Sequence, residues 1–125
     1  MLPDVFSLLN VAAVRAFVGT PPRIYRHGQA PQDAVAPYIT WFSVYGRPEI
    51  TLSETPAVDN YTIQVDCWSN NTGTGSTQVN ALAMAVRDTI EARFHVTAQS
   101  IDEQDFQTQR YRIGLQFTYF EHRAP

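Results

Sequence analysis

The 125-residue chain contains no lysine, because all nine of its basic residues are arginine. It has a single cysteine, Cys67, and therefore cannot form an internal disulfide. Its longest apolar stretches are a few residues, far from the roughly twenty that a membrane-spanning helix needs. Its N-terminal segment lacks the basic start and the continuous apolar run of a secretory signal. The sequence therefore predicts an intracellular product that does not cross a membrane.

The charge balance also excludes a class of partner. Twelve acidic residues outnumber the nine arginines, which gives a formal net charge of −3. Nonspecific binding to nucleic acid needs concentrated positive charge to displace counterions from phosphate, so the net charge argues against it. We expect no specific nucleic-acid binding either. The exclusive use of arginine suits paired contacts at protein interfaces. A GC-biased genome explains it equally well.

Cys67 directly follows Asp66, which raises the question of a cysteine nucleophile. A catalytic cysteine is activated by a base or by a positive environment. Asp66 provides neither, because successive strand side chains point to opposite faces and a neighbouring carboxylate raises the pKa of a thiol. The pattern favours a core cysteine and predicts no catalytic residue.

Metal and cofactor motifs are equally weak. The three histidines, His27, His95 and His122, do not have metal-ligand spacing. The segment 73–77, GTGST, precedes a predicted helix but lacks the lysine of a P-loop and the further glycine of a dinucleotide-binding turn. The acidic segment 102–105 lacks the glycine and closing glutamate of a calcium loop. We therefore expect no metal and no cofactor.

Two helices are predicted. Asp4 is placed to cap a helix that ends near Gly19, before two prolines. A second helix follows Ser76 or Thr77, either of which is a suitable N-cap. Its apolar positions recur at helical spacing: Val79, Leu82, Ala83, Val86, Ile90 and Phe94.

Five segments are predicted to be strands, from their β-branched and aromatic content or their alternation: Arg23–Arg26, Tyr38–Tyr45, Tyr61–Trp68, Val96–Ile101 and Gln109–Phe120. Asp102–Asp105 is predicted to be a turn, and Arg47–Asp59 a long loop or projecting hairpin. The resulting order is α-β-β-β-α-β-β. We expect one α+β domain over residues 1–125, with a mixed, mainly antiparallel sheet packed against two helices.

The strand periodicity also predicts which side chains face away from the core. At a period of two, Tyr61, Ile63, Val65 and Cys67 share the apolar face. The opposite face carries six residues that we expect at a subunit interface: Gln64, Asp66, Trp68, Arg110, Arg112 and Phe120. Exposed tryptophan and arginine together are typical of such contacts. A covering helix from the same chain is the alternative.

With these segments placed, the chain resembles the tail-completion, or tail-terminator, family of long-tailed phages. The likeness covers nearly the whole chain and rests on a succession of segments rather than on one signature: MLPDVFSLLN, AVRAFVG, RIY, HGQAPQDAVAPYITW, YTIQVDCW, ALAMAVRDTIEA and RYRIGLQFTYF.

The resemblance implies a structural virion protein of the tail, made in the host bacterial cytoplasm. Members of the family form a ring, usually hexameric, at the head-proximal end of the tail tube, with DNA passing through it. The implied partners are other copies of the chain, the tail-tube protein and the head connector or head-completion protein. No catalytic residue is carried over from the family.

Two loops are the expected docking elements for these partners. They are the His27–Val35 loop and the Arg47–Asp59 projection, which contribute the following candidates: His27, Gln29, Gln32, Asp33, Arg47, Glu49 and Glu54.

Two other functions remain open at this point. One is a head-closure or adaptor protein on the portal side. The other is a small enzyme or ligand-binding domain with a pocket near Cys67, Tyr61 and Tyr111.

Overall fold

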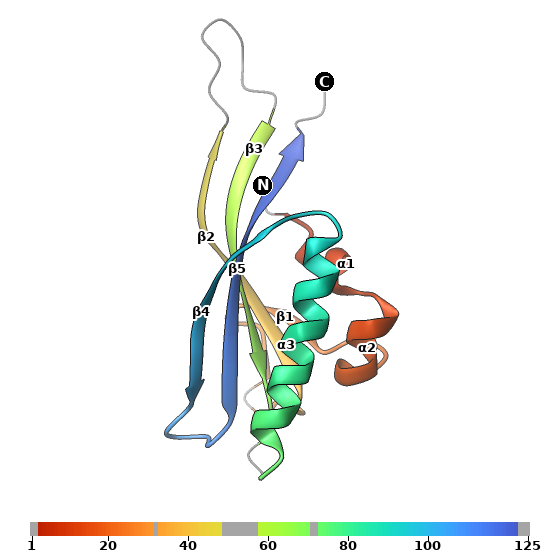
Figure 1. Ribbon diagram of the computed structural model, residues 1–125, viewed down its shortest axis with the longest axis vertical. Coiled ribbons are helices and arrows are strands. Elements are labelled where there is room, and N and C mark those ends of the chain that lie inside the picture. Colours follow the sequence, from red (N-terminus) through yellow and green to blue (C-terminus); the bar gives the residue numbers. More distant parts are fainter. Residues whose placement is uncertain (1–2, 32, 49–57, 71–72, 123–125) are drawn as a thin grey trace, which may run out of the picture.

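The computed structural model describes residues 3–31, 33–48, 58–70 and 73–122, which form a sheet with helices on one of its faces (Figure 1). The elements in chain order are α1 (Val5–Leu9), α2 (Ala12–Val18), β1 (Ile24–Arg26), β2 (Tyr38–Pro48), β3 (Val58–Trp68), α3 (Gly75–Glu91), β4 (Val96–Gln104) and β5 (Tyr111–His122). The predicted α+β class and element order are confirmed.

The sheet has five strands in the order β1-β2-β3-β5-β4. Only β1 and β2 pair in parallel, and the other neighbours are antiparallel. Cys67 of β3 lies opposite Ile39 of β2 on one side and opposite Ile113 of β5 on the other. This register aligns the apolar positions of the three central strands on one face, as the alternation predicts.

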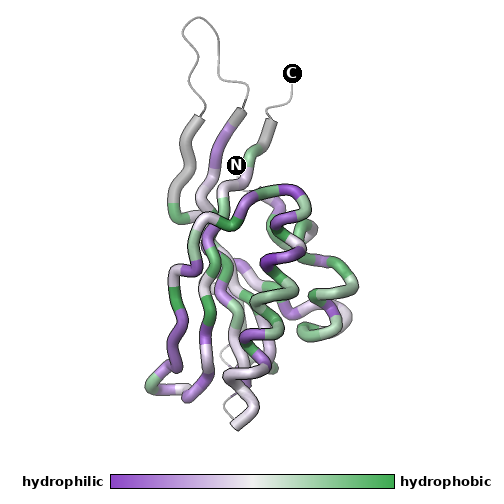
Figure 2. Tube along the Cα trace, in the orientation of Figure 1, coloured by the Kyte–Doolittle hydropathy of each residue, from purple (hydrophilic) through white to green (hydrophobic). Residues whose placement is uncertain are grey.

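α3 supplies the main cover of that face. Its predicted apolar stripe is buried, and Ile63, Val65, Cys67 and Phe117 of the sheet are fully buried against the helices. In Figure 2 the hydrophobic segments gather where α3 and the central strands face each other. The start of α3 differs from the prediction, because Thr74 holds the N-cap position and its side chain makes no capping hydrogen bond.

The N-terminal helix is split in two, which corrects the prediction of one continuous helix. Asp4 caps α1 as expected, with its carboxylate accepting from the Ser7 backbone N–H at 3.1 Å. The helix then breaks at Asn10, a residue type that favours caps and turns over helix interiors. Arg15 holds the break, because its Nη1 donates to the carbonyl oxygen of Asn10 at 2.9 Å and to its Oδ1 at 2.8 Å. Gly19, at φ 85°, ends α2.

Four strands extend further than predicted, among them β3, which begins at Val58, and β5, which ends at His122. β2 continues past Tyr45 to Pro48, which lies opposite Asp59 of β3. β4 continues past Ile101 to Gln104, so that residues 102–104 form strand where a turn was expected. In β2 and β4 pairing with a neighbouring strand overrides a weak local propensity. The predicted projection lies between β2 and β3, and its residues 49–57 lie outside the described residues.

Candidate assembly surface

The second face of the sheet carries no helix in the described part of the chain (Figure 1). The strand register places Gln64 opposite both Phe42 and Gln116, and Trp68 opposite both Tyr38 and Arg112, on this helix-free face. The alternative of a covering helix from the same chain is therefore not seen in the described residues. This face holds the residues that the sequence predicts for subunit contacts.

Two of these residues are buried within a polar cluster formed by Gln64, Asp66, Ser100, Arg112 and Gln116. Gln64 and Asp66 are each 3% exposed. Gln64 Nε2 donates to Asp66 Oδ1 at 2.8 Å, and Arg112 Nη2 donates to Asp66 Oδ2 at 3.1 Å. Ser100 and Gln116 both donate to Gln64 Oε1, at 3.0 and 2.9 Å. The cluster neutralises the buried carboxylate inside the subunit, as a buried charge requires.

Arg112 connects this cluster to an aromatic stack. The Tyr38 and Trp68 rings lie parallel, with centroids 5.9 Å apart and 9° between their planes. The guanidinium of Arg112 lies 5.1 Å from the Trp68 centroid, and that of Arg110 lies 5.4 Å from the Tyr38 centroid. Trp68 Nε1 donates to Thr40 Oγ1 at 3.0 Å. Each ring of the stack is thus in contact with one arginine, and cation–π attraction helps to hold the four side chains together.

Of the six predicted interface residues, the fold brings five into one connected cluster and stack. Gln64 and Asp66 form its buried base, whereas Trp68, Arg110 and Arg112 are half-buried at its surface. Phe120 lies apart, towards the end of β5 opposite Asn60, and its side chain is 50% exposed.

Arg110 also holds the His27–Val35 loop. Its Nη2 donates to the carbonyl oxygen of Ala34 at 3.0 Å, and Ala34 is buried. His27, Gln29 and Asp33 of this loop are exposed, and the His27 ring lies 5.3 Å from that of Phe42.

Of the other predicted docking residues, the structure describes one. Arg47 lies in β2 opposite Asn60, so it belongs to a strand and not to a loop. Gln32, Glu49 and Glu54 lie outside the described residues.

Cys67 is a core residue. Its side chain is fully buried. Burial, and secondly the charge of Asp66, raise the pKa of the Cys67 thiol. Tyr61 and Tyr111, which the enzyme or ligand-binding alternative placed at a pocket beside it, pack against the core. A thiol in this environment is not a nucleophile.

The family model for "Tail completion protein gp17" matches residues 5–120. The chain belongs to this family. It is therefore a structural protein of the phage tail and not an enzyme.

Two solved structures are similar to this tail completion protein. A chain from the virion of a native gene transfer agent particle is 20% identical, with a TM-score of 0.64, and the match covers 91% of this chain and 88% of that one. The gp17 protein of bacteriophage SPP1 is 18% identical over 96% of this chain and 88% of that one, with a TM-score of 0.45. The first likeness supports the fold. A search of curated proteins found no match.

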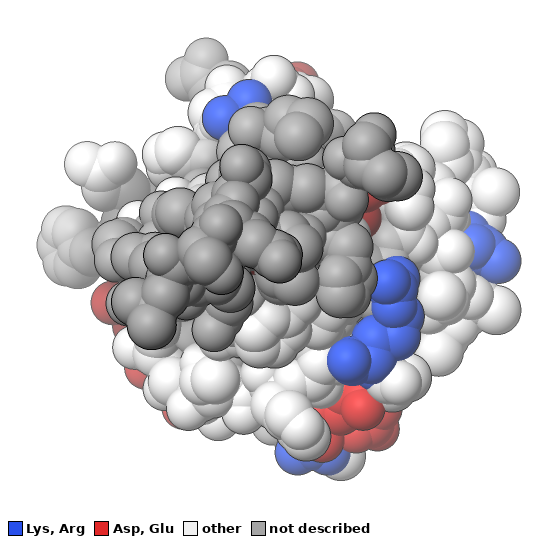
Figure 3. All heavy atoms as spheres, turned by 90° about the horizontal axis from the view of Figure 1, so that it is seen from above, with Lys and Arg blue, Asp and Glu red and all other residues white. Residues whose placement is uncertain are grey.

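The described residues of this tail completion protein show neither a membrane nor a metal feature. Within the ranges that the structure describes, no helix is long and apolar enough to span a membrane, and no three His, Cys, Asp or Glu side chains gather as a metal site would require. Figure 3 views the end of the molecule where β2 and β5 end and β3 begins, and its described surface shows basic and acidic side chains next to each other.

Sequence reasoning missed two surface features of the tail completion protein. One is a shallow cleft between α3 and the β4–β5 hairpin. The other is Phe106, whose side chain is 89% exposed in the turn between β4 and β5. An aromatic residue within the polar run from Asp102 to Gln109 was the signal available for the second. The cleft had no sequence signal, because it depends on how far β4 lies from α3.

Proposed function

We propose that this tail completion protein forms a ring at the head-proximal end of the tail tube, where it ends tube polymerisation and provides the surface that joins tail to head. Its partners are copies of itself, the tail-tube protein and the head connector, and DNA passes through the ring. The observation that carries the proposal is the helix-free face, which presents half-buried Trp68, Arg110 and Arg112 and half-exposed Phe120 in a family of tail proteins.

A ring requires each subunit to offer two unlike patches that match on neighbouring copies. The helix-free face suits one such patch, because aromatic and arginine side chains there are already fixed by the stack and lose little side-chain freedom on binding. Gln64 and Asp66 contribute indirectly, by holding Arg112 from below. The helix-covered face presents a different surface, which meets the requirement for two patches.

The His27–Val35 loop suits contact with the tube or the connector. Its exposed His27, Gln29 and Asp33 offer polar groups, while Arg110 and Arg23 anchor its end through Ala34 and Pro37. A loop that is anchored at one end binds a partner at a lower entropic cost than a free one.

The proposal is tested by polymerising purified tail-tube subunits with and without this protein and measuring tube lengths by electron microscopy. A terminator yields short tubes whose length falls as its molar ratio rises, with a ring of extra density at one end. Sedimentation velocity of the free protein over a range of concentrations establishes when the ring forms. A ring that appears only on tubes is also consistent with the proposal.

Unchanged tube lengths would contradict tail termination. If the protein then binds purified connector and not tubes, it is a head-closure or adaptor protein on the portal side. Mixing the protein separately with each partner therefore distinguishes the two roles.

A further inference from the structure

The turn between β4 and β5 presents Phe106 on a rigid frame. Asp105 and Arg110 close the turn, with the Asp105 N–H donating to the Arg110 carbonyl at 2.7 Å. Gln109 Nε2 donates to the carbonyl oxygen of Phe106 at 2.7 Å, and the Gln107 N–H donates to Asp105 Oδ1 at 3.0 Å. Gln109 has a φ of 63°, which L-residues adopt only where the surroundings impose it. The backbone that carries Phe106 is thus fixed by its own hydrogen bonds.

A phenylalanine that is 89% exposed on such a frame is unusual. It gains nothing from the subunit's own core. Large aromatic side chains that are held in place before binding are typical anchors of protein interfaces, because little entropy is lost when they are buried. Phe106 therefore has the properties of an anchor that requires an apolar recess on a partner.

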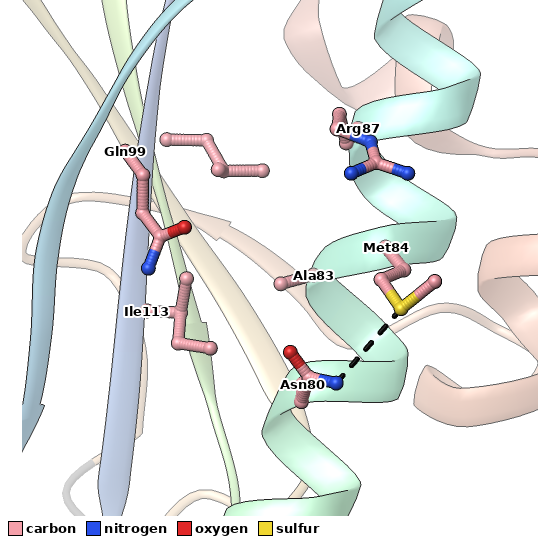
Figure 4. A pocket seen from close by; sticks show the side chains of 7 residues that line it. Asn80, Ala83, Met84, Arg87, Gln99 and Ile113 are labelled. Atoms are coloured by element: carbon pink, nitrogen blue, oxygen red, sulfur yellow. Dashed lines mark hydrogen bonds between the residues drawn. The ribbon is translucent and has the colours of Figure 1, made fainter.

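A recess with matching properties exists elsewhere on the same chain. The described residues lining the cleft between α3 and the hairpin are Asn80, Ala83, Met84, Arg87, Gln99, Ile113 and Leu115. Figure 4 shows Ala83 and Ile113 facing each other across it, with Met84 and Asn80 at one side. Met84 is 47% exposed, so an apolar side chain at the mouth is in contact with water.

The size of the cleft limits what enters it. Its volume is about 80 Å³. A closed cavity that holds benzene has about 150 Å³. The open cleft is therefore large enough for part of a phenyl ring and does not enclose a whole one.

The charges around the two features are complementary. Arg87 is the one charged side chain among the described lining residues, and its side chain is 45% exposed. Its ion pair with Asp88 is exposed, so it contributes little and exchanges readily. Asp102 and Asp105 both precede Phe106 in the sequence, and Asp102 is exposed whereas Asp105 is half-buried. A turn that carries acidic groups suits a rim that carries Arg87.

We infer that Phe106 of one subunit inserts into the cleft between α3 and β5 of a second copy of this chain. The inference rests on the proposed ring and names its second patch. The Phe106 turn adjoins Arg110, so it continues the helix-free patch, whereas the cleft lies on the helix side of the neighbour. One contact of this kind joins unlike surfaces, and repetition of it closes a ring.

Two substitutions test the two halves of this contact, the anchor and the cleft, separately. Phe106→Ala removes the anchor and keeps the cleft, whereas Met84→Glu places a negative charge at the cleft mouth and keeps the anchor. Both positions are exposed, so we expect both variants to unfold at the wild-type urea midpoint. We expect each to weaken self-association by at least about 30-fold in sedimentation velocity. Phe6→Ala, another exposed phenylalanine, and Ser76→Glu, an added charge on α3, are matched controls with wild-type association.

Mixing the two variants gives a sharper result. The intact anchor of the Met84→Glu variant fits the intact cleft of the Phe106→Ala variant, so an equimolar mixture forms a heterodimer and stops there. An interface made of two identical patches does not predict this outcome. If both variants associate like wild type, or if the mixture stays as weak as the separate variants, the inference is wrong.

A crosslinking experiment separates this inference from the proposed function, and it also works if the free protein is monomeric. The double variant Gln107→Cys with Asn80→Cys, two exposed positions beside the anchor and the cleft that leave Phe106 and Met84 in place, is treated with a short bis-maleimide on capped tubes, where buried Cys67 is inaccessible. We expect a ladder of covalent oligomers that ends at the copy number of the ring, and only monomer from each single variant. Capped tubes without a ladder overturn the contact and leave the ring intact. A ladder on protein that does not shorten tubes keeps the contact and overturns the terminator role.

Discussion

Cys67 shows how one residue's position on a strand determines its chemistry. Its thiol points into the core between Ile39 and Ile113, while the carboxylate of Asp66 points to the helix-free face and is neutralised there by Arg112. The thiol has no base, and desolvation opposes its ionisation, so its pKa is raised. The residue serves packing alone.

This burial makes stability depend on pH in the alkaline range. An unfolded thiol has a pKa of about 8.5, and the folded value is higher, so its contribution is fully present below about pH 8.5 and is lost above it. We expect the free energy of unfolding to fall by about 1.4 kcal/mol for each further pH unit. Urea titrations of wild type and Cys67→Ala between about pH 8 and pH 10 measure the difference in slope, because the variant lacks this term. Parallel curves for the two proteins would show that folding does not raise the pKa of the Cys67 thiol.

At the scale of elements, the polar cluster depends on how closely β5 approaches β3. Gly114 lies opposite Asp66, and a Cβ at this position would be 2.8 Å from Asp66 Oδ1 and would also meet Gln64 Nε2 and Ser100 Oγ. No side chain fits there without displacing buried, hydrogen-bonded groups. Glycine is required at position 114 because the side chains of the cluster come so close to it, and not because of the backbone angles of Gly114.

Gly114→Ala is therefore expected to destabilise the protein, although the same change in a strand usually stabilises by lowering the entropy of the unfolded chain. The added methyl breaks the hydrogen bond between Gln64 and Asp66, at a cost of about 1–3 kcal/mol. Gly73→Ala is the matched control, because nothing lies within 4 Å of a Cβ at that position. Urea unfolding of both variants checks the difference. Equal stability of the two would show that the cluster adjusts freely.

The elements also show which parts of the fold are predictable from sequence. α3 and the faces of β3 and β5 follow from periodicity, because each has a long, one-sided apolar pattern. The break at Asn10 depends on Arg15 folding back, and residues 102–104 of β4 depend on pairing with β5. Neither feature can be predicted from the few residues that surround it in the sequence.

The residues of the candidate site divide in the same way, into features that the sequence pattern predicts and features that depend on contacts between strands. Alternation correctly places Gln64 and Asp66 on the helix-free face, but their burial depends on Ser100 and Arg112, from other strands. The stack of Tyr38 and Trp68 requires the register of β2 and β3, which no motif in the sequence encodes.

At the scale of the whole molecule, the subunit has its core on one side of a single sheet. The helices seal one face, while the helix-free face is sealed by polar and aromatic side chains only around the cluster and stack. Further along this face, the side chain of Phe120 is 50% exposed. A subunit of this kind still has apolar area to bury on assembly.

Phe120 tests whether this face is buried in the assembled tail. Phe120→Asp changes an exposed position, so we expect the isolated subunit to keep its unfolding midpoint within about 0.5 kcal/mol of wild type. In an assembled ring the same carboxylate would be desolvated without a partner, which weakens the contact by 2 kcal/mol or more, roughly 30-fold. We therefore expect the variant to lose control of tube length in the polymerisation assay. Phe6→Asp on α1, at a side chain 40% exposed on the helix side, supplies the control and is expected to cap tubes like wild type. Because both variants carry the same new charge, only burial of the helix-free face distinguishes them, and normal capping by Phe120→Asp would show that this face stays in contact with solvent in the virion.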